Sequence, residues 1–210
     1  MKHWKQTLLC LALLAGCGTA SDENSQIGLV RSVLSSQAAQ PRFTALLQSG
    51  APVLQVAFVR TQQGTNILLE HQRGDFEYWL ASEGAQVILQ KGMLHGIRGL
   101  GDGLLASELS QPMAHVFGLK SGFSDRFHTY LNGNDEAVTR TYRCQVNVGD
   151  KAPITLASKT ISTRLVTESC RSLDQEFTNL YWVDPKQRRI VQSRQWIGPR
   201  SGYISTRVTH

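Results

Sequence analysis

The chain has 210 residues, a formal net charge of +6 and hydrophobic residues at 41% of its positions. This length is within the range of one domain with a sizeable core. The positive charge is modest and spread along the sequence, and no RNA-binding or helix-turn-helix signature is present. We therefore expect no nucleic-acid partner.

The first 16 residues have the three parts of a secretory signal. Lys2, His3 and Lys5 form a basic start, residues 8–14 form a short apolar run, and Ala15-Gly16 are small. The apolar run is far shorter than the roughly 20 residues that a membrane-spanning helix needs. We predict a cleaved signal peptide over residues 1–16.

Cys17 follows the small pair directly, and Leu-Ala-Gly-Cys resembles a bacterial lipobox. The resemblance implies that the Cys17 thiol receives a diacylglyceryl group and becomes the mature N-terminus, anchored in a membrane by its acyl chains. The alternative is an ordinary signal with a cysteine at the cleavage point. Gly18, where an Asp would indicate inner-membrane retention, favours the outer membrane with the domain facing the periplasm.

Small and polar residues follow Cys17, so residues 17–26 are expected to form a lipidated flexible tether. A tether of this length and composition reaches about 15–18 Å from the membrane.

Two further cysteines, Cys144 and Cys170, remain after the leader and the lipidated position are set aside. An even pair in strand-like segments of an exported chain favours a disulfide, which would contribute about 3 to 4 kcal/mol in the chain-entropy model. Two free buried thiols are the alternative. No CxxC, HExxH or His/Cys cluster is present, so no metal or other cofactor is expected.

Apolar residues at helical spacing predict a helix over residues 26–37, and a second short helix is expected over 43–48. Short strands separated by Gly-containing turns follow, at residues 53–60, 65–72, 76–81, 85–90 and 93–98. Their spacing of roughly 10 residues is typical of an antiparallel meander.

The Gly-rich stretch at residues 98–104 lacks the βαβ context of a nucleotide loop, so a structural turn is the preferred interpretation. Residues 104–125 show the least periodicity and predict a mixture of helix and loop. Further strands are expected at residues 126–131, 138–148, 159–169, 176–183, 190–196 and 202–209. The sequence thus predicts one mostly β domain over residues 27–210, an antiparallel meander curled into a sandwich or partly open barrel, with one or two short N-terminal helices.

Basic residues cluster at one place, Lys186-Gln187-Arg188-Arg189, next to the turn signal Asp184-Pro185. A solvated hairpin tip is the favoured interpretation, and a site for an anionic ligand is the alternative.

The C-terminal block contains Asn179-Leu180-Tyr181-Trp182-Val183-Asp184, a turn, and then Ser193-Arg194-Gln195-Trp196-Ile197-Gly198-Pro199. Together with the Arg98-Gly99-Leu100-Gly101 turn and the lipobox, this block resembles the YjbF-type, or group 4 capsule GfcB-type, lipoproteins. The resemblance implies an outer-membrane lipoprotein of mostly β structure that works in exopolysaccharide or capsule production. Its implied partners are an outer-membrane β-barrel protein and polysaccharide-export proteins, and no catalytic residues come with the family.

The aromatic residues of this block allow two interpretations. They fill a β core, or they form a surface on which sugar rings stack while Arg and Gln bind hydroxyls. The candidate residues for such a surface are Trp79, Tyr181, Trp182, Arg194, Gln195 and Trp196.

Three function classes follow. The preferred one is a non-enzymatic accessory or assembly subunit that docks on an outer-membrane barrel or export complex, for example through a strand edge. The alternative is a polysaccharide-binding module. An enzyme is the least supported, because no carboxylate pair, GxSxG motif or Cys–His pair stands out.

Overall fold

The computed structural model describes residues 39–100, 103–134 and 136–209. The predicted leader, Cys17, the tether and the helix expected over 26–37 lie outside these residues. The two described helices are α3 (Pro41–Gln48) and α4 (Ser110–Gly118), and neither is long and apolar enough to cross a membrane.

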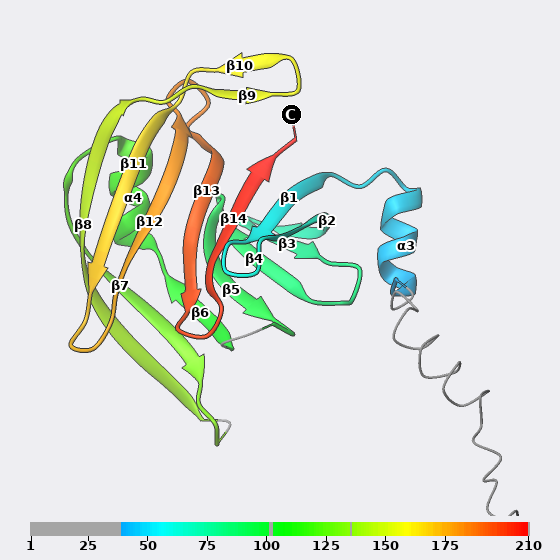
Figure 1. Cartoon of the computed structure of the whole chain (residues 1–210), viewed down its shortest axis with the longest axis horizontal. Coiled ribbons are helices and arrows are strands. Elements are labelled where there is room, and N and C mark those ends of the chain that lie inside the picture. The colour runs from blue at the N-terminus through cyan, green and yellow to red at the C-terminus, as the bar shows by residue number, and fades with distance from the viewer. Residues whose placement is uncertain (1–38, 101–102, 135, 210) are drawn as a thin grey trace, which may run out of the picture. The chain divides into compact units, whose positions relative to one another are not determined.

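Fourteen strands make up most of the described chain (Figure 1). They are β1 (Val53–Phe58), β2 (Gln63–Arg73), β3 (Phe76–Leu80), β4 (Gln86–Gln90), β5 (Met93–Arg98), β6 (Leu104–Glu108), β7 (Gly122–Leu131), β8 (Ala137–Lys151), β9 (Ile154–Leu156), β10 (Lys159–Ile161), β11 (Arg164–Arg171), β12 (Glu176–Asp184), β13 (Arg189–Gly198) and β14 (Gly202–Val208).

Twelve strands form one antiparallel sheet in the order β5-β4-β3-β2-β1-β14-β13-β12-β11-β8-β7-β6. Nearly every strand pairs with its neighbour along the chain, while the β9–β10 hairpin forms a small sheet of its own and β1 pairs with β14. The sheet curls until its two edge strands approach each other (Figure 1). The predicted fold class, a curled or partly open antiparallel barrel, is confirmed.

The β5–β6 seam nearly closes the barrel without a backbone ladder. A Cβ on Gly96 of β5 would lie 2.7 Å from the carbonyl oxygen of Leu105 on β6, so only glycine allows this approach. The His95 Nδ1 atom lies 2.9 Å from the carbonyl oxygen of Ser107. Burial lowers the pKa of His95, although this hydrogen bond opposes the shift. The neutral ring therefore donates from Nδ1 to Ser107 and joins the two edge strands.

Three sequence predictions need correction. Residues 104–108 form strand β6, which was not predicted, and β7 begins at Gly122 rather than at 126. The strand predicted over 159–169 is two strands, β10 and β11, separated by a break at residues 162–163. Thr163 explains the break, because its backbone carbonyl and hydroxyl both bond Ala152 and turn the chain from one sheet into the other.

The interior contains two large apolar clusters. One is built by β1–β5 with parts of β6, β13 and β14, and includes Trp79. The other lies under α4, whose Val116 is fully buried against Val146, Val166 and Val183 of the sheet. Because α4 packs on the concave face of β7, β8 and β12, it fills one side of the barrel.

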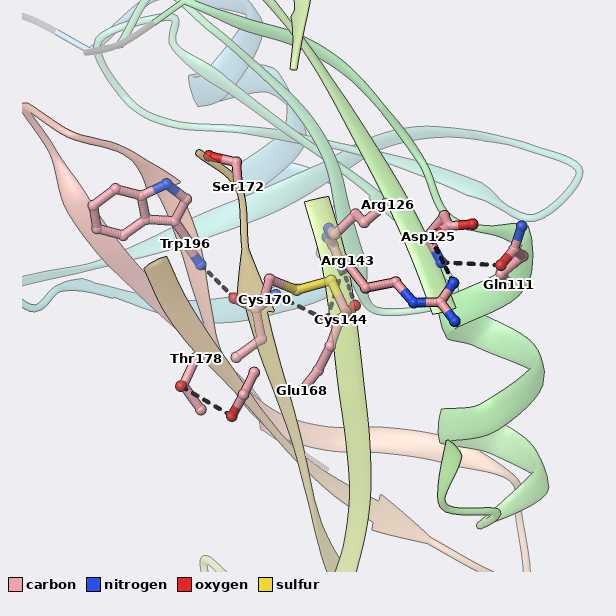
Figure 2. Close-up of a disulfide and its surroundings, with 12 residues drawn as sticks. Gln111, Asp125, Arg126, Arg143, Cys144, Glu168, Cys170, Ser172, Thr178 and Trp196 are labelled. Atoms are coloured by element: carbon pink, nitrogen blue, oxygen red, sulfur yellow. Dashed lines mark hydrogen bonds and ion pairs between the residues drawn. A yellow bond between two sulfur atoms is a disulfide. The ribbon is translucent and has the colours of Figure 1, made fainter. Parts of the chain in front are cut away.

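The Cys144–Cys170 disulfide joins β8 to β11, and the two residues are directly opposite each other in the register (Figure 2). The predicted disulfide is confirmed. It packs with the buried rings of Tyr142 and Phe177 at the end of the barrel where β12 begins.

We expect the double variant Cys144→Ala/Cys170→Ala to lose about 3 kcal/mol of unfolding free energy, since the crosslink restricts the unfolded chain. Urea unfolding with and without reductant measures this loss. Reductant should shift the midpoint of the parent protein and leave the double variant unchanged. A parent midpoint that is insensitive to reductant contradicts the prediction.

Candidate functional site

A buried ion pair lies at the centre of the polar interior. Arg126 of β7 and Glu168 of β11 are 1% and 0% exposed, and the Arg126 Nη1 atom lies 2.8 Å from Glu168 Oε2. The same carboxylate accepts hydrogen bonds from the Asn179 amide at 2.9 Å and the Tyr181 hydroxyl at 2.8 Å. The charges are therefore both paired and hydrogen-bonded, as buried charges must be.

His128 completes the network in its neutral form. Arg126 Nε donates to His128 Nε2 at 2.8 Å, so the ring proton is on Nδ1 and faces the Tyr130 hydroxyl at 2.9 Å. Burial and the nearby Arg126 charge hold the pKa of His128 well below its ordinary value. Burial opposes the charge of Arg126 itself, but Glu168 and Tyr181 together raise the pKa of the guanidinium. Burial also raises the pKa of Tyr181 well above its ordinary value.

The polar residues of the C-terminal motif hold the architecture. Gln195 Oε1 accepts the backbone N–H of Leu94 at 2.7 Å, while its Nε2 donates to the Gly92 carbonyl at 3.0 Å, which ties β13 to β5 across the interior. Asp184 Oδ1 accepts the backbone N–H groups of Lys186 and Gln187 and fixes the β12–β13 turn. These motif positions therefore have structural roles.

The structure does not bring the six predicted surface residues onto one face. Tyr181 and Gln195 are fully buried, and Trp79 is 7% exposed on the other side of the barrel. Trp182, Arg194 and Trp196 are half-buried and alternate with the buried positions of β12 and β13, which places them on the outer face. Of the six predicted residues, these three alone can contribute to a site on the outer surface.

The outer face is hollowed where β12 separates from β13. Their ladder ends at Leu180, and beyond it side chains replace the missing backbone bonds. Asn179 Oδ1 accepts the Trp196 N–H at 2.8 Å, and the Tyr203 hydroxyl accepts the Thr178 N–H at 3.1 Å. Trp196 packs into the gap, stacked on Phe177 with ring centroids 5.8 Å apart.

A groove of about 720 Å³ runs from this gap over β12, β11 and β8. One row of directly paired residues crosses it: Phe123, Gln145, Ser169 and Thr178. Tyr203 closes the row, with the Arg194 guanidinium 4.5 Å from its ring centroid and Trp196 packed edge-on against it. We call this the outer groove. It combines aromatic rings with amide and hydroxyl groups, the side-chain types that bind sugars.

The charged groups at the outer groove are already paired. Arg143 bonds Asp125 at 2.8 Å, next to the disulfide in Figure 2, and Arg171 bonds Glu176 at 2.7 Å. Glycoside hydrolysis requires two carboxylates that face each other across a cleft. Here Asp125 and Glu176 each face an arginine instead. The outer groove is suited to binding a neutral, hydroxyl-rich ligand.

Among the described residues, Cys144, Glu168 and Cys170 form the one cluster with metal-ligating atoms close together. The two sulfurs are bonded to each other and Glu168 is bonded to Arg126, so this cluster has no free ligand set.

The sequence reasoning missed Phe123, Gln145 and Tyr203 of the outer groove. Phe123 is 59% exposed, but it lies in a segment expected to be helix or loop. Alternation within β14 gives the face of Tyr203, but its position opposite Trp196 follows from the pairing of β13 with β14, which alternation does not show.

The described residues define a curled antiparallel β domain, and the comparison with known proteins gives its family. The chain belongs to the family described as "Group 4 capsule polysaccharide lipoprotein gfcB, YjbF", whose model matches residues 28–208. The fold is similar to that of the hypothetical lipoprotein YmcC from Escherichia coli (K12), with a TM-score of 0.68 and 17% sequence identity over 87% of this chain and 94% of that chain. No curated protein matches the sequence.

We expect Glu168→Ala to lose about 3–5 kcal/mol of unfolding free energy, because it leaves the buried Arg126 charge without a partner. The double variant Arg126→Met/Glu168→Leu removes both charges and should be more stable than Glu168→Ala alone. Chemical unfolding of the three proteins measures this order. A double variant less stable than the single one would show that the pair itself supplies the stability.

Stability should fall on acidification below the ordinary histidine pKa of about 6.5. Because the pKa of His128 is lowered in the folded state, the unfolded chain binds the proton first and unfolding is favoured as the pH falls. The slope from this one group is at most about 1.4 kcal/mol per pH unit. The free energy of unfolding, measured between pH 7.5 and 5, should depend less on pH for His128→Gln than for the parent. Asp174→Asn, an exposed control, should keep the slope of the parent.

Proposed function

We propose that this protein is a non-enzymatic accessory subunit of capsule or exopolysaccharide production, anchored at the outer membrane through Cys17 with its domain in the periplasm. It docks through a strand edge on an outer-membrane barrel or polysaccharide-export protein. The observation that carries this proposal is a stretch of β8 that pairs on one side only. The family and the lipobox support the anchored setting.

The free edge is the first part of β8. In the described chain β11 ends opposite Arg143, so residues 137–142 of β8 pair only with β7. Leu131, opposite Ala137, sends its N–H away from β8 to the Gly103 carbonyl at 3.1 Å. Antiparallel alternation then directs the N–H of Ala137, and of Thr139 two residues further, to the free side.

This edge has the properties of a strand-addition site. The β7–β8 hairpin extends beyond the other strands (Figure 1). Leu131 and Val138 beside the edge are exposed apolar side chains that line a hollow of about 370 Å³ with Pro199. An added strand gains main-chain hydrogen bonds from the edge and side-chain contacts from the hollow.

Thr139→Pro removes an outward N–H while leaving the inward bonds to β7, so it should weaken docking but not folding. Affinity copurification from crosslinked cells should recover an envelope protein with the parent and with Thr139→Ala, which keeps the N–H. We expect about a fivefold to thirtyfold lower yield with Thr139→Pro, given the loss of about 1–2 kcal/mol for an unmade hydrogen bond. Equal recovery by all three proteins would show that this edge is not the docking site.

The outer groove favours a second function, binding of the polysaccharide itself. Phe123 is exposed at one end of the groove, and the paired hydroxyls of Ser169 and Thr178 are 3.3 Å apart within it. Sugar rings present apolar faces to aromatic side chains and hydroxyls to polar ones.

Phe123→Ala should weaken binding of the native polymer about fivefold to tenfold, the effect of one aromatic contact worth about 1 kcal/mol. Leu173→Ala, a fully exposed position outside the groove, is the matched control. Glycan binding by the purified protein measures both. Release of reducing ends from the polymer would instead establish an enzyme.

A further inference from the structure

The open end of the barrel opposite the β7–β8 hairpin contains a pocket that neither the family nor the proposed function accounts for. It has a volume of about 480 Å³, within the range of small-molecule sites. Strand β1 begins there and β14 ends there, and residues of β3, β4 and the start of β13 complete the wall. We call it the barrel-mouth pocket.

Apolar side chains form the walls of the barrel-mouth pocket. Leu54, Leu69, Trp79 and Leu89 line it on one side, and Ile190 and Val191 on the other. Leu54, Trp79 and Leu89 belong to the larger apolar cluster of the interior, and Ile190 belongs to the second one. The indole N–H of Trp79 is already used, because it donates to Glu77 Oε2 at 3.0 Å. The wall thus offers hydrocarbon and an aromatic ring, and few hydrogen bonds, to an occupant.

Cations surround the opening. Lys91 is on the β4–β5 turn, and Arg188 and Arg189 are on the β12–β13 turn. The adjoining hollow under the β9–β10 hairpin shares Arg189 and adds Lys159 and Lys186. Acids are fewer: Asp75 pairs with Lys91 at 3.0 Å, Glu77 holds the indole, and Asp184 caps the turn. The rim is therefore positive above an apolar interior.

Arg188 has a backbone conformation that favours glycine. Its φ of 51° lies in the left-handed region, yet a long cationic side chain occupies the position and is exposed at the rim. Glycine or asparagine would adopt this turn at lower cost.

We propose that the barrel-mouth pocket binds an amphiphilic anion, an alkyl chain with a phosphate or carboxylate head. The chain occupies the apolar pocket against Trp79, and the head group is bound at the rim by Arg188 and its basic neighbours. The sequence favours a solvated hairpin tip for the Lys186–Arg189 cluster over a site for an anionic ligand. The pocket beside this cluster supports the anionic-ligand interpretation. A lipid of the surrounding membrane and a free amphiphile share this chemistry.

The test uses the full lipidated protein in nanodiscs of zwitterionic phospholipid, with tryptophan fluorescence as the readout. Brominated hexadecyl phosphate and brominated palmitate are added as probes, because bromine quenches an indole only on contact. We expect saturable quenching that disappears in Trp79→Phe. The brominated alcohol of the same length, which lacks the charge, should bind about tenfold more weakly if one charge-assisted contact is lost.

Two variants separate the pocket from the rim. Val208→Phe fills the pocket without adding a second indole and should abolish saturable quenching of Trp79 by either anion. Arg188→Asn keeps the turn conformation and removes the cation, and should weaken binding of the anions about fivefold to tenfold without affecting the alcohol. Arg98→Asn, an exposed arginine outside both this pocket and the outer groove, is the matched control.

The outcomes are decisive in both directions. Quenching that persists in Trp79→Phe or Val208→Phe, equal affinity for anion and alcohol, or no quenching at all would overturn the proposal. Quenching by brominated anionic phospholipid built into the same nanodisc identifies a membrane lipid as the source. Quenching by the added probes alone identifies a free amphiphile. These results are independent of the copurification and glycan-binding experiments.

Discussion

The requirement that the buried charges of Arg126 and Glu168 remain paired is the constraint on which the shape of the native barrel depends. These residues are on β7 and β11, which are separated by β8, and they lie opposite β8 residues that are four positions apart, Tyr142 and Val146, so in a flat sheet their backbones would be about 16–17 Å apart. A direct bond between their side chains on the concave face requires curvature at this place. Because each charge is fully buried, any flattening that separated them would expose two unpaired ions to an apolar interior.

The outer groove and the gap that feeds it follow from the same network. Asn179 donates to Glu168 and accepts from the Trp196 backbone, so one amide side chain connects the ion pair to the place where β12 leaves β13. The disulfide lies beside it and holds β8 to β11 at the same level. The buried network around Glu168 thus determines the shape of the outer groove, although the residues of the network are not exposed there.

Much of the fold was predictable from local patterns, because a meander pairs strands that are neighbours in sequence. Alternation and glycine-containing turns located most strands, and the Cys144–Cys170 pair needed only the export signal and two strand-like segments. The closure was not predictable, since Gln195 bonds a strand 101 residues away in the chain and Gly96 packs on β6, a strand that local patterns do not indicate. The strand β6 was missed because its few residues are followed directly by a helix.

The candidate site was predictable only in part, for a specific physical reason. Alternation shows that Tyr181 and Trp182 face opposite sides of a strand, but it does not show which side is the interior. Glu168 decides this, because its partners must share its face, and a lone glutamate in a strand gives no sign of being buried. Trp79 was grouped with the C-terminal aromatics by residue type, yet it lies on the far side of the barrel.

The pairing of β1 with β14 has a consequence for the order of assembly. Strands β1–β5 form one meander and strands β6–β13 form the other. Each meander is continuous in sequence, so its strands can pair before the rest of the chain is present. Strand β14, at residues 202–208, joins the two meanders by backbone hydrogen bonds, because it pairs with β1 on one side and with β13 on the other. The sheet therefore cannot be completed until residues 202–208 are available, however early the two meanders form. The topology itself thus separates the formation of the meanders from the closure of the sheet in time.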